Sequence, residues 1–215
     1  GNVVAKQLGS NVIFCSVNVT DDEAITTAIE NVMAAFGAIH VCVNCAGRGG
    51  GATKTLGRAG RFPIELFKNV IDINLIGTFN VLIQCAEKMA LNDPDEKGER
   101  GVIINTASIA AFDGQRGQVA YAASKAALVG ITLPIARDLA YYGIRIVTIA
   151  PGLFETPLLK NMTLETKKDL AKDIQFPPRL GVTEEYSKLA LHVVNNIYLN
   201  GETIRLDGAL RMGVN

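Results

Sequence analysis

The stretch that decides the fold is residues 101–152, GVIINTASIAAFDGQRGQVAYAASKAALVGITLPIARDLAYYGIRIVTIAPG. It begins with the apolar run Val102 to Ala107 and ends with a second such run, Ile144 to Ala150. Between these runs, Gln118 to Tyr141 has the length and periodicity of a helix. Two buried strands joined by a helix form a βαβ unit, whose strands lie parallel. Residues 101–152 therefore predict an α/β fold built on a parallel sheet.

Short apolar runs and helical stretches alternate on both sides of this unit. The apolar runs predict three further strands, at Val12 to Val17, Ile39 to Asn44 and Glu202 to Leu206. The helical stretches predict helices at residues 20–36, 63–85 and 184–196. This order predicts a Rossmann-like, doubly wound parallel sheet with helices on both faces.

Local signals mark where the predicted helices begin and end. Thr20 to Glu23 fits a capping box, in which the Thr20 hydroxyl accepts from the amide of Glu23. Pro63 suits the first turn of the next helix, and the polar stretch Arg48 to Arg61 before it is expected to be a loop. Pro134 lacks an amide hydrogen, so it predicts a kink or a helix end near Leu133.

The amino-terminal part departs from this plan. The chain opens on a helical stretch, Val3 to Leu8. A doubly wound dinucleotide-binding domain begins instead with a strand, a glycine-rich turn and a helix. We therefore expect the first βαβ portion, with its phosphate loop, to be absent from this chain. Residues 1–215 are expected to form a single domain that is incomplete at its amino-terminal end.

The charge balance excludes some classes of partner. Twenty-one basic side chains match twenty-one acidic ones, so nothing favours binding to the phosphates of nucleic acid. No uncharged apolar run reaches the roughly 18 residues that a membrane span needs, so we expect none.

The four cysteines include one C-x-x-C pair, Cys42 and Cys45, which suggests zinc or redox chemistry. A structural zinc site needs a second ligand pair, and a redox pair should open a helix, whereas this pair ends a strand-like run. Buried free thiols and no metal site are expected.

The strongest candidate site centres on Tyr121 and Lys125. Four residues separate them, so on a helix their side chains share one face. A lysine ammonium near a phenol favours the phenolate, which makes the tyrosine an efficient proton-transfer group. Ser108 ends a predicted strand, where ligands of parallel sheets bind. The alternative for Tyr121 and Lys125 is a solvated pair on a helix surface.

Asn74 lies in the middle of the apolar stripe of its predicted helix. Burying an unpaired amide costs about 1 to 3 kcal/mol, so a functional reason is favoured over an asparagine satisfied by its neighbours.

Two other patterns fail their structural context. Residues 47–52 match G-x-G-x-x-A, but a polar loop follows instead of the apolar helix that a dinucleotide site requires. Ser108 is outside any G-x-S-x-G elbow, and only His40 and His192 could serve as its base. An acyl-transfer triad is therefore not expected.

Several of these motifs occur in the order found in short-chain dehydrogenases/reductases. They are Val43 to Gly47, Asn74, Ser108, Tyr121-x-x-x-Lys125 and Pro151-Gly152. The sequence resembles this family over almost its whole length. It is most similar to the subgroup that acts on 3-hydroxyacyl-CoA and hydroxysteroids, which carries an insertion where Arg48 to Arg61 lies.

The resemblance implies an oxidoreductase that transfers a hydride between NAD(H) and a secondary alcohol or ketone, either a 3-hydroxyacyl-CoA or a hydroxysteroid. Tyr121 would be the general acid/base, and Lys125 its electrostatic partner and a ribose ligand. Ser108 would bind the substrate oxygen together with Tyr121, and Asn74 would hold a water in the proton relay.

The resemblance also implies a set of cofactor-binding residues besides Tyr121 and Lys125. They are Asn18 and Val19 at the adenine, Cys45, Ala46 and Gly47 beneath the cofactor, and Pro151, Phe154 and Thr156 at the nicotinamide end. Asn18 stands where the family often has aspartate, and its amide oxygen can still accept a hydrogen bond.

The resemblance implies that the protein is a homotetramer and that it is located in the mitochondrion. The alternative location is the cytoplasm. The partner would be a small-molecule substrate. The alternative is a non-catalytic binding or assembly protein that lacks a complete cofactor site.

Overall fold

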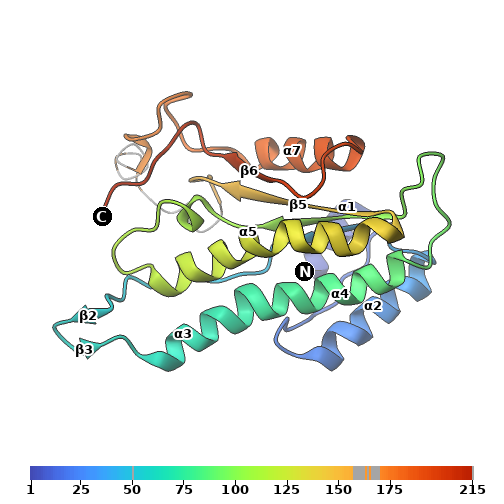
Figure 1. Cartoon of the computed structure of the whole chain (residues 1–215), viewed down its shortest axis with the longest axis horizontal. Coiled ribbons are helices and arrows are strands. Elements are labelled where there is room, and N and C mark those ends of the chain that lie inside the picture. Colours follow the sequence, from blue (N-terminus) through green and yellow to red (C-terminus); the bar gives the residue numbers. More distant parts are fainter. Residues whose placement is uncertain (50, 157–162, 164, 166–169, 215) are drawn as a thin grey trace.

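The computed structural model describes residues 1–49, 51–156, 163, 165 and 170–214. Its central sheet consists of parallel strands in the order β1-β4-β5-β6 (Figure 1). Their bounds are β1 (Val41–Asn44), β4 (Gly101–Thr106), β5 (Ile144–Pro151) and β6 (Thr203–Leu206). The predicted α/β fold with a parallel sheet is confirmed.

Alternate residues of the two central strands enter two different cores. Ile103 of β4 and Ile146 of β5 pack with helices α2 (Asp22–Phe36), α4 (Thr78–Met89) and α5 (Val119–Leu139). Ile104 and Val147, one residue further along, pack against α7 (Thr183–Asn195) on the other face. Figure 1 shows α4 and α5 on one side of the sheet and α7 on the other. Both faces are covered, which explains why these strands are continuous apolar runs.

The helix predicted from Pro63 to Cys85 consists of three consecutive segments. They are α3 (Ile64–Ile71), the π-helical turn η1 (Asp72–Gly77) and α4. The wider turn centres on Asn74, and such π-turns often mark functional sites. The remaining short helices are α1 (Asn2–Leu8), η2 (Ile109–Ala111) and η3 (Ala140–Tyr142).

Helix α5 continues past Pro134 to Leu139, so the helix does not end near Leu133, and a kink there stays a prediction. The proline removes only one amide hydrogen. Buried Ile135 and Ala136 follow it directly, and their packing keeps the last turns of the helix on the sheet.

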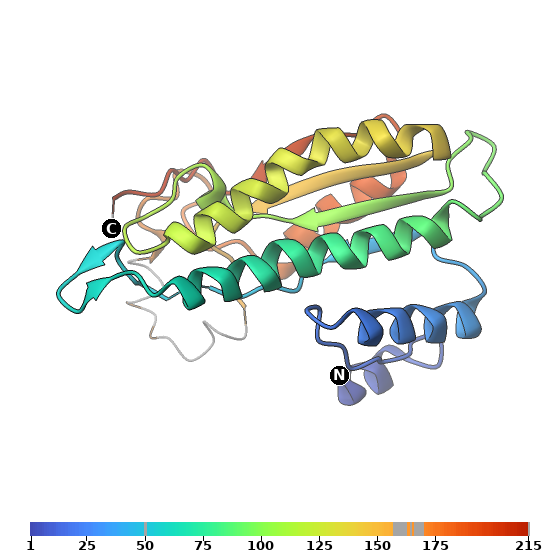
Figure 2. The same ribbon diagram turned by 60° about the horizontal axis from the view of Figure 1, so that its bottom comes forward.

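The predicted strand Val12 to Val17 is also wrong. No described strand pairs with this segment, and Val12, Ile13 and Phe14 are all exposed. A strand requires a hydrogen-bonded neighbour, and β1 is paired in the described sheet only with β4. Figure 2 shows the amino-terminal segment with α2, apart from the sheet strands.

Two local predictions also need correction. The cap of α2 is Asp21, whose Oδ1 accepts from Ala24 N at 3.1 Å, and Thr20 instead donates to Asn18. The carboxylate one residue later reaches the helix amides, so the Thr20 capping box does not form. The Arg48 to Arg61 loop contains a small antiparallel hairpin, β2 (Leu56–Gly57) and β3 (Gly60–Arg61).

All four cysteines are free, as predicted. Cys42 is buried, but Cys45 is exposed because β1 ends at Asn44 and the chain leaves the sheet there. The expectation of a buried Cys45 is therefore wrong. The described ranges contain no cluster of three or more His, Cys, Asp or Glu residues that could hold a metal ion.

Two helical stretches, Ile64–Met89 and Val119–Tyr142, are long and apolar enough to cross a membrane by length and composition. Both pack against other elements of this fold and carry buried polar residues, among them Asn74 and Lys125. Core helices of water-soluble proteins have the same composition.

Candidate active site

The candidate site lies where the central strands end. β1 ends at Asn44, β4 at Thr106 and β5 at Pro151, so the segments that follow meet at one edge of the sheet. Turn η1 and the first turns of α5 cover this edge and supply the remaining side chains. Ligands of open parallel sheets bind at this edge.

Asn74 is completely buried in η1 and its amide is fully paired. Its Oδ1 accepts from Arg48 N at 2.8 Å, and its Nδ2 donates to Arg48 O and to Ser124 Oγ, each at 2.9 Å. These bonds join the turn to the Arg48 loop and to α5. Neighbouring groups therefore account for the buried amide without a ligand, and its role in holding a relay water stays a prediction.

Lys125 is 5% exposed and is the charged centre of the site. Its Nζ donates to the carbonyl of Thr106 at 2.7 Å and lies 5.9 Å from the centroid of the Tyr121 ring. Burial lowers the pKa of Lys125 to about 8, and the nearby Cys45 thiol opposes this shift. The described residues offer Nζ one acceptor for its three donor positions, so two N–H groups can bind a ligand.

Gly47 leaves space next to this ammonium. A Cβ atom at Gly47 would lie 3.3 Å from Asn74 Oδ1, which is tighter than an ordinary contact, and 3.4 Å from Lys125 Nζ, at the limit of one. A larger residue would therefore crowd the two polar groups. The unfilled donors of Lys125 and the absence of a side chain at Gly47 fit a hydroxyl-bearing ligand, such as the ribose of a dinucleotide.

Tyr121 and Ser108 approach the same edge from two elements. Tyr121 lies half-buried in the first turns of α5, one helical turn before Lys125. Ser108 follows β4, and its Oγ accepts from Ala110 N at 3.1 Å at the start of η2, which packs against α5. The Ser108 hydroxyl hydrogen remains available as a donor to a substrate oxygen.

The residues predicted at the adenine lie beside η1. Val19 packs against Gly77, where a Cβ atom would come within 2.7 Å of Val19 Cγ2. Asn18 is exposed, and its Oδ1 already accepts from Thr20 N at 3.2 Å and Thr20 Oγ1 at 3.0 Å. The Asn18 oxygen therefore stabilises the turn before α2. Recognition of adenine by Asn18 stays a prediction.

Cys45 and Ala46 connect the end of β1 to Gly47. The Cys45 thiol lies 3.5 Å from Thr106 Oγ1, which brings it to the strand end that holds Lys125. The structure thus brings together the predicted residues Cys45, Gly47 and Asn74 with the Tyr121 and Lys125 pair.

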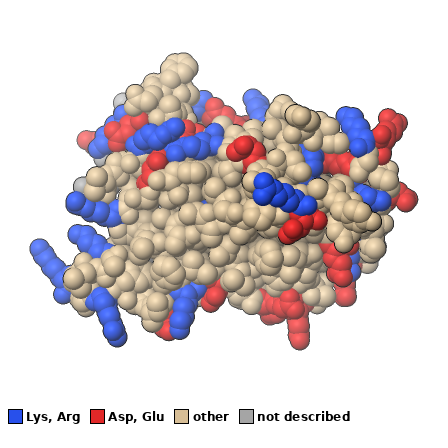
Figure 3. Space-filling view, in the orientation of Figure 1, with Lys and Arg blue, Asp and Glu red and all other residues tan. Residues whose placement is uncertain are grey.

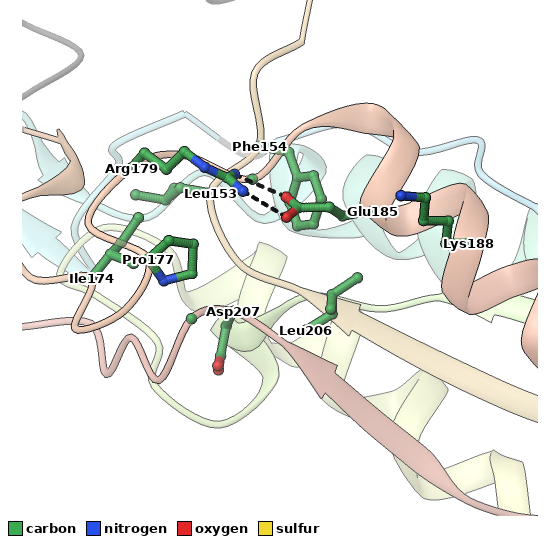
Figure 4. Close-up of a pocket in the computed structure, with 11 residues that line it drawn as sticks. Leu153, Phe154, Ile174, Pro177, Arg179, Glu185, Lys188, Leu206 and Asp207 are labelled. Carbon is green, nitrogen blue, oxygen red and sulfur yellow. Dashed lines mark hydrogen bonds and ion pairs between the residues drawn. The ribbon is translucent and has the colours of Figure 1, made fainter.

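Phe154 belongs to a neighbouring part of the protein. It follows Pro151 and forms a bridge with Gly181, and it lines a cavity of about 370 Å³ (Figure 4). Leu153, Leu206 and the ion pair of Arg179 with Glu185 also line this cavity, whereas Ser108, Tyr121, Lys125 and Asn74 do not. Thr156 is exposed at the end of a described range. The structure therefore does not place Phe154 or Thr156 in contact with the catalytic candidates.

Comparison with known proteins identifies the family to which this chain belongs. The family model of short chain dehydrogenases matches residues 2–167. The chain belongs to the short-chain dehydrogenase family. Membership confirms the predicted oxidoreductase class and the Rossmann-like fold.

Individual relatives of this dehydrogenase are similar over nearly its whole length. The 3-hydroxyacyl-CoA dehydrogenase type-2 of Homo sapiens is 50% identical over 99% of this chain and 82% of that protein. Its namesake in Drosophila melanogaster is 52% identical over 99% of this chain and 84% of that protein.

Solved structures agree with these relatives. The 3-hydroxyacyl-CoA dehydrogenase type-2 of Mycobacterium avium has a TM-score of 0.96 and 40% identity, covering 100% of this chain and 83% of that one. A 7α-hydroxysteroid dehydrogenase in complex with NADH and 7-oxo glycochenodeoxycholic acid has a TM-score of 0.83 and 25% identity, covering 98% and 78%.

Three further residues of the dehydrogenase site were missed by sequence reasoning. Thr106 holds Lys125 through its carbonyl, and its Oγ1 lies 2.6 Å from the hydroxyl of Tyr186, which comes from α7. Ser124 is fully buried between Asn74 and the carbonyl of Tyr121. The position of Ser124 directly before Lys125 in the sequence could have indicated its place in the site. Nothing in the sequence links Tyr186 to the site.

Proposed function

We propose that this short-chain dehydrogenase oxidises a 3-hydroxyacyl-CoA at its secondary alcohol, and reduces the corresponding ketone, with NAD(H). The observation that carries the proposal is the buried Lys125 ammonium beside the Tyr121 ring, whose Nζ has one acceptor, Thr106 O, within the described part of the chain. A buried cation with open donors is suited to bind ligand hydroxyls and to stabilise a phenolate.

In the oxidation, Tyr121 as phenolate takes the proton of the substrate hydroxyl. The Ser108 hydroxyl donates to the substrate oxygen and orients it, while Lys125 stabilises the phenolate before the proton arrives. Bound NAD⁺ supplies the acceptor for the hydride that leaves the carbinol carbon. In the reduction, Tyr121 returns the proton to the oxygen.

The ribose of the cofactor would be held by Lys125 and would pass over Gly47. Cys45 and Ala46 would lie beneath the cofactor, with Asn18 and Val19 toward the adenine and Pro151, Phe154 and Thr156 toward the nicotinamide. NAD(H) as cofactor agrees with the NADH named for the 7α-hydroxysteroid dehydrogenase complex.

The substrate class is supported by the relatives. Those with about half of their residues identical to this chain are named 3-hydroxyacyl-CoA dehydrogenase type-2. A hydroxysteroid is the second candidate, favoured by the fold similarity to the 7α-hydroxysteroid dehydrogenase. Measured kcat/KM for a 3-hydroxyacyl-CoA and for a hydroxysteroid would rank the two.

A homotetramer is the proposed assembly. Helices α4 and α5 present exposed apolar side chains, among them Phe79, Ile83 and Leu133. Figure 3 shows a broad area with few charges across the middle of the face over these helices. Such a face is suited to pack against a second copy. A solution mass of one chain at micromolar concentration would contradict this assembly.

The proposed compartment is the mitochondrion. It is supported by the likeness of the sequence to the subgroup of 3-hydroxyacyl-CoA dehydrogenases. Cell fractionation followed by detection of the protein tests it, and recovery only in the cytosolic fraction would contradict it.

Tyr121→Phe tests the proposed chemistry. The ring stays and only the hydroxyl is lost, so NADH binding should remain within about twofold while turnover falls by about 10² to 10⁴-fold. Calorimetry measures the binding, and NADH absorbance with a 3-hydroxyacyl-CoA measures the turnover. Retention of more than about a tenth of the turnover, an effect below about 1.4 kcal/mol, would show that Tyr121 is not the proton-transfer residue.

A further inference from the structure

One segment joins the two residues that would hold the substrate oxygen. Ser108 lies at its start and Tyr121 at its end, and between them run η2 and the loop Phe112 to Gln118. The relative position of the two hydroxyls therefore depends on how this loop is anchored.

Arg205 of β6 anchors the loop near its beginning. Its Nη2 lies 2.5 Å from Asp113 Oδ2, and its guanidinium lies over the ring of Phe112, 5.1 Å from the centroid. The same Nη2 donates to Leu210 O at 3.0 Å, while Nε lies 2.7 Å from Asp207 Oδ2. One side chain thus fixes the loop to the strand β6 and to the segment that follows it.

This ion pair is better shielded than a surface pair. The side chains of Arg205 and Asp113 are 21% and 17% exposed, and that of Asp207 is 8% exposed. The hydrogen bonds from Arg205 hold the pKa of Asp113 below its usual range, so the pair stays ionised at neutral pH. Shielded, bidentate contacts of arginine constrain geometry more than exposed pairs do.

The segment after β6 touches the loop at further points. Arg116 N donates to Val214 O at 3.0 Å, and Gln115 Nε2 lies 3.4 Å from Gly213 O. Leu210 is buried in one cluster with Ile109, the residue directly after Ser108. The carboxyl-terminal segment and the loop therefore form one packed unit, and Arg205 of β6 adds a charged contact to it.

We propose that Arg205, through Asp113, is a positioning residue that holds the Ser108 hydroxyl in register with the Tyr121 hydroxyl. The inference rests on the proposed function, since it assigns the reacting oxygens to these two residues. Small displacements of catalytic groups lower rates steeply, and about 1 Å can cost about 10²-fold.

Arg205→Gln tests the role, with Arg211→Gln as the matched control. Arg211 binds the same Asp207 carboxylate at 3.2 Å, but its side chain is 61% exposed. It acts on Asp113 of the loop only through the attraction between their charges, whereas Arg205 hydrogen-bonds to Asp113 directly. We expect Arg205→Gln to lower kcat by about 10 to 10²-fold with NADH affinity within about twofold, and Arg211→Gln to keep kcat within about twofold. Equal kcat in both variants would overturn the proposal.

A double-mutant cycle separates positioning from general loss of stability. If Arg205 acts by placing Ser108, then Arg205→Gln should have little further effect on kcat once Ser108→Ala has removed the positioned hydroxyl. If the two substitutions instead lower kcat by the product of their separate effects, they act independently, and the proposal is overturned. Arg205→Lys keeps the charge without the planar fork, so its kcat should lie between wild type and Arg205→Gln.

Asp113→Asn provides the second route if Arg205→Gln fails to fold, because it removes the charge of the partner with little change of shape. Its kcat should fall in the same range, and wild-type kcat in a folded Asp113→Asn would overturn the proposal. Tyr121→Phe keeps the two conclusions distinguishable. An active Tyr121→Phe contradicts the proposed function, whereas an inactive Tyr121→Phe beside a fully active Asp113→Asn contradicts only the role of Arg205.

Discussion

Two buried cations lie at opposite ends of the parallel sheet, and each is 5% exposed. Lys125 lies at the carboxyl end, below the carbonyl of Thr106 where β4 ends. Arg145 is near the start of β5, where the strand enters the sheet. Burying a charge is unfavourable at both places, but the two side chains differ in the hydrogen-bond partners that compensate for it.

Arg145 has acceptors for its whole guanidinium. Its Nε and Nη2 lie 2.8 and 2.7 Å from Glu99 Oε1. Its Nη atoms also donate to carbonyls at the end of α7 and just beyond, those of Val193, Val194, Asn196 and Leu199. Lys125 has one acceptor among the residues described, Thr106 O, and no carboxylate partner there.

The difference is the one expected between a charge that stabilises the fold and, as we propose for Lys125, a charge that serves a ligand. Arg145 satisfies the carbonyls at a helix end, which otherwise lack partners, so its charge is fully used inside the protein. Lys125 has a single acceptor in the described ranges, lies at the edge where ligands of parallel sheets bind, and burial lowers its pKa to about 8.

The largest expected effect is the loss of turnover when the Lys125 ammonium is removed, and it tests the contrast between Lys125 and Arg145. Lys125→Met keeps the stem and removes the ammonium, so kcat should fall by about 10² to 10⁴-fold and NADH binding should weaken as well. The free energy of unfolding at pH 7 should not decrease, since a poorly paired buried charge is removed. Steady-state kinetics and urea unfolding measure the two quantities. A clear loss of stability with normal turnover would place Lys125 in the same class as Arg145.

Substitution of Arg145, at the other end of the sheet, is expected to lower stability and to leave turnover almost unchanged. Arg145→Met leaves Glu99 and the α7 carbonyls without their donor, so the free energy of unfolding should fall by about 3 to 5 kcal/mol. The turnover of the folded fraction should stay close to that of wild type. Arg179→Met is the control, because its pair with Glu185 is 48% and 36% exposed and should contribute at most about 1 kcal/mol. Equal losses in both arginine variants would refute the assignment of Arg145.

The smallest effect is a dependence of stability on pH. The pKa of Lys125 falls from 10.5 to about 8 in the folded protein, so between these values the unfolded chain binds the proton and the folded chain does not. Stability from this group therefore rises as pH increases through this range and is lost as pH falls through it. At about 1.4 kcal/mol for each pKa unit, wild type should gain up to about 3 kcal/mol relative to Lys125→Met between pH 7 and pH 10. Urea unfolding at both values measures this gain, and parallel pH profiles of the two proteins would contradict it.

Elements with a strong local pattern were predicted well from the sequence. The apolar runs that became β4 and β5 are buried on both faces, so their composition alone indicates central parallel strands. The run Val12 to Val17 has a similar composition and is not a strand, because pairing depends on a neighbour that no local pattern encodes. Pro134 shows the same limit, since tertiary packing carries α5 past it.

The sequence by itself determined the alternation of strands and helices, the helical spacing of Tyr121 and Lys125, and the place of Ser108 after a strand, because each of these is a local pattern. Only the tertiary structure decided that Thr106 and Asn74 would surround Lys125 and that Arg205 would reach Asp113 across 92 positions of the chain. These contacts form between segments that the parallel sheet brings together, and no short-range pattern specifies which polar groups meet there. The candidate residues of the site were therefore recognisable in the chain, whereas the polar groups around them required the fold.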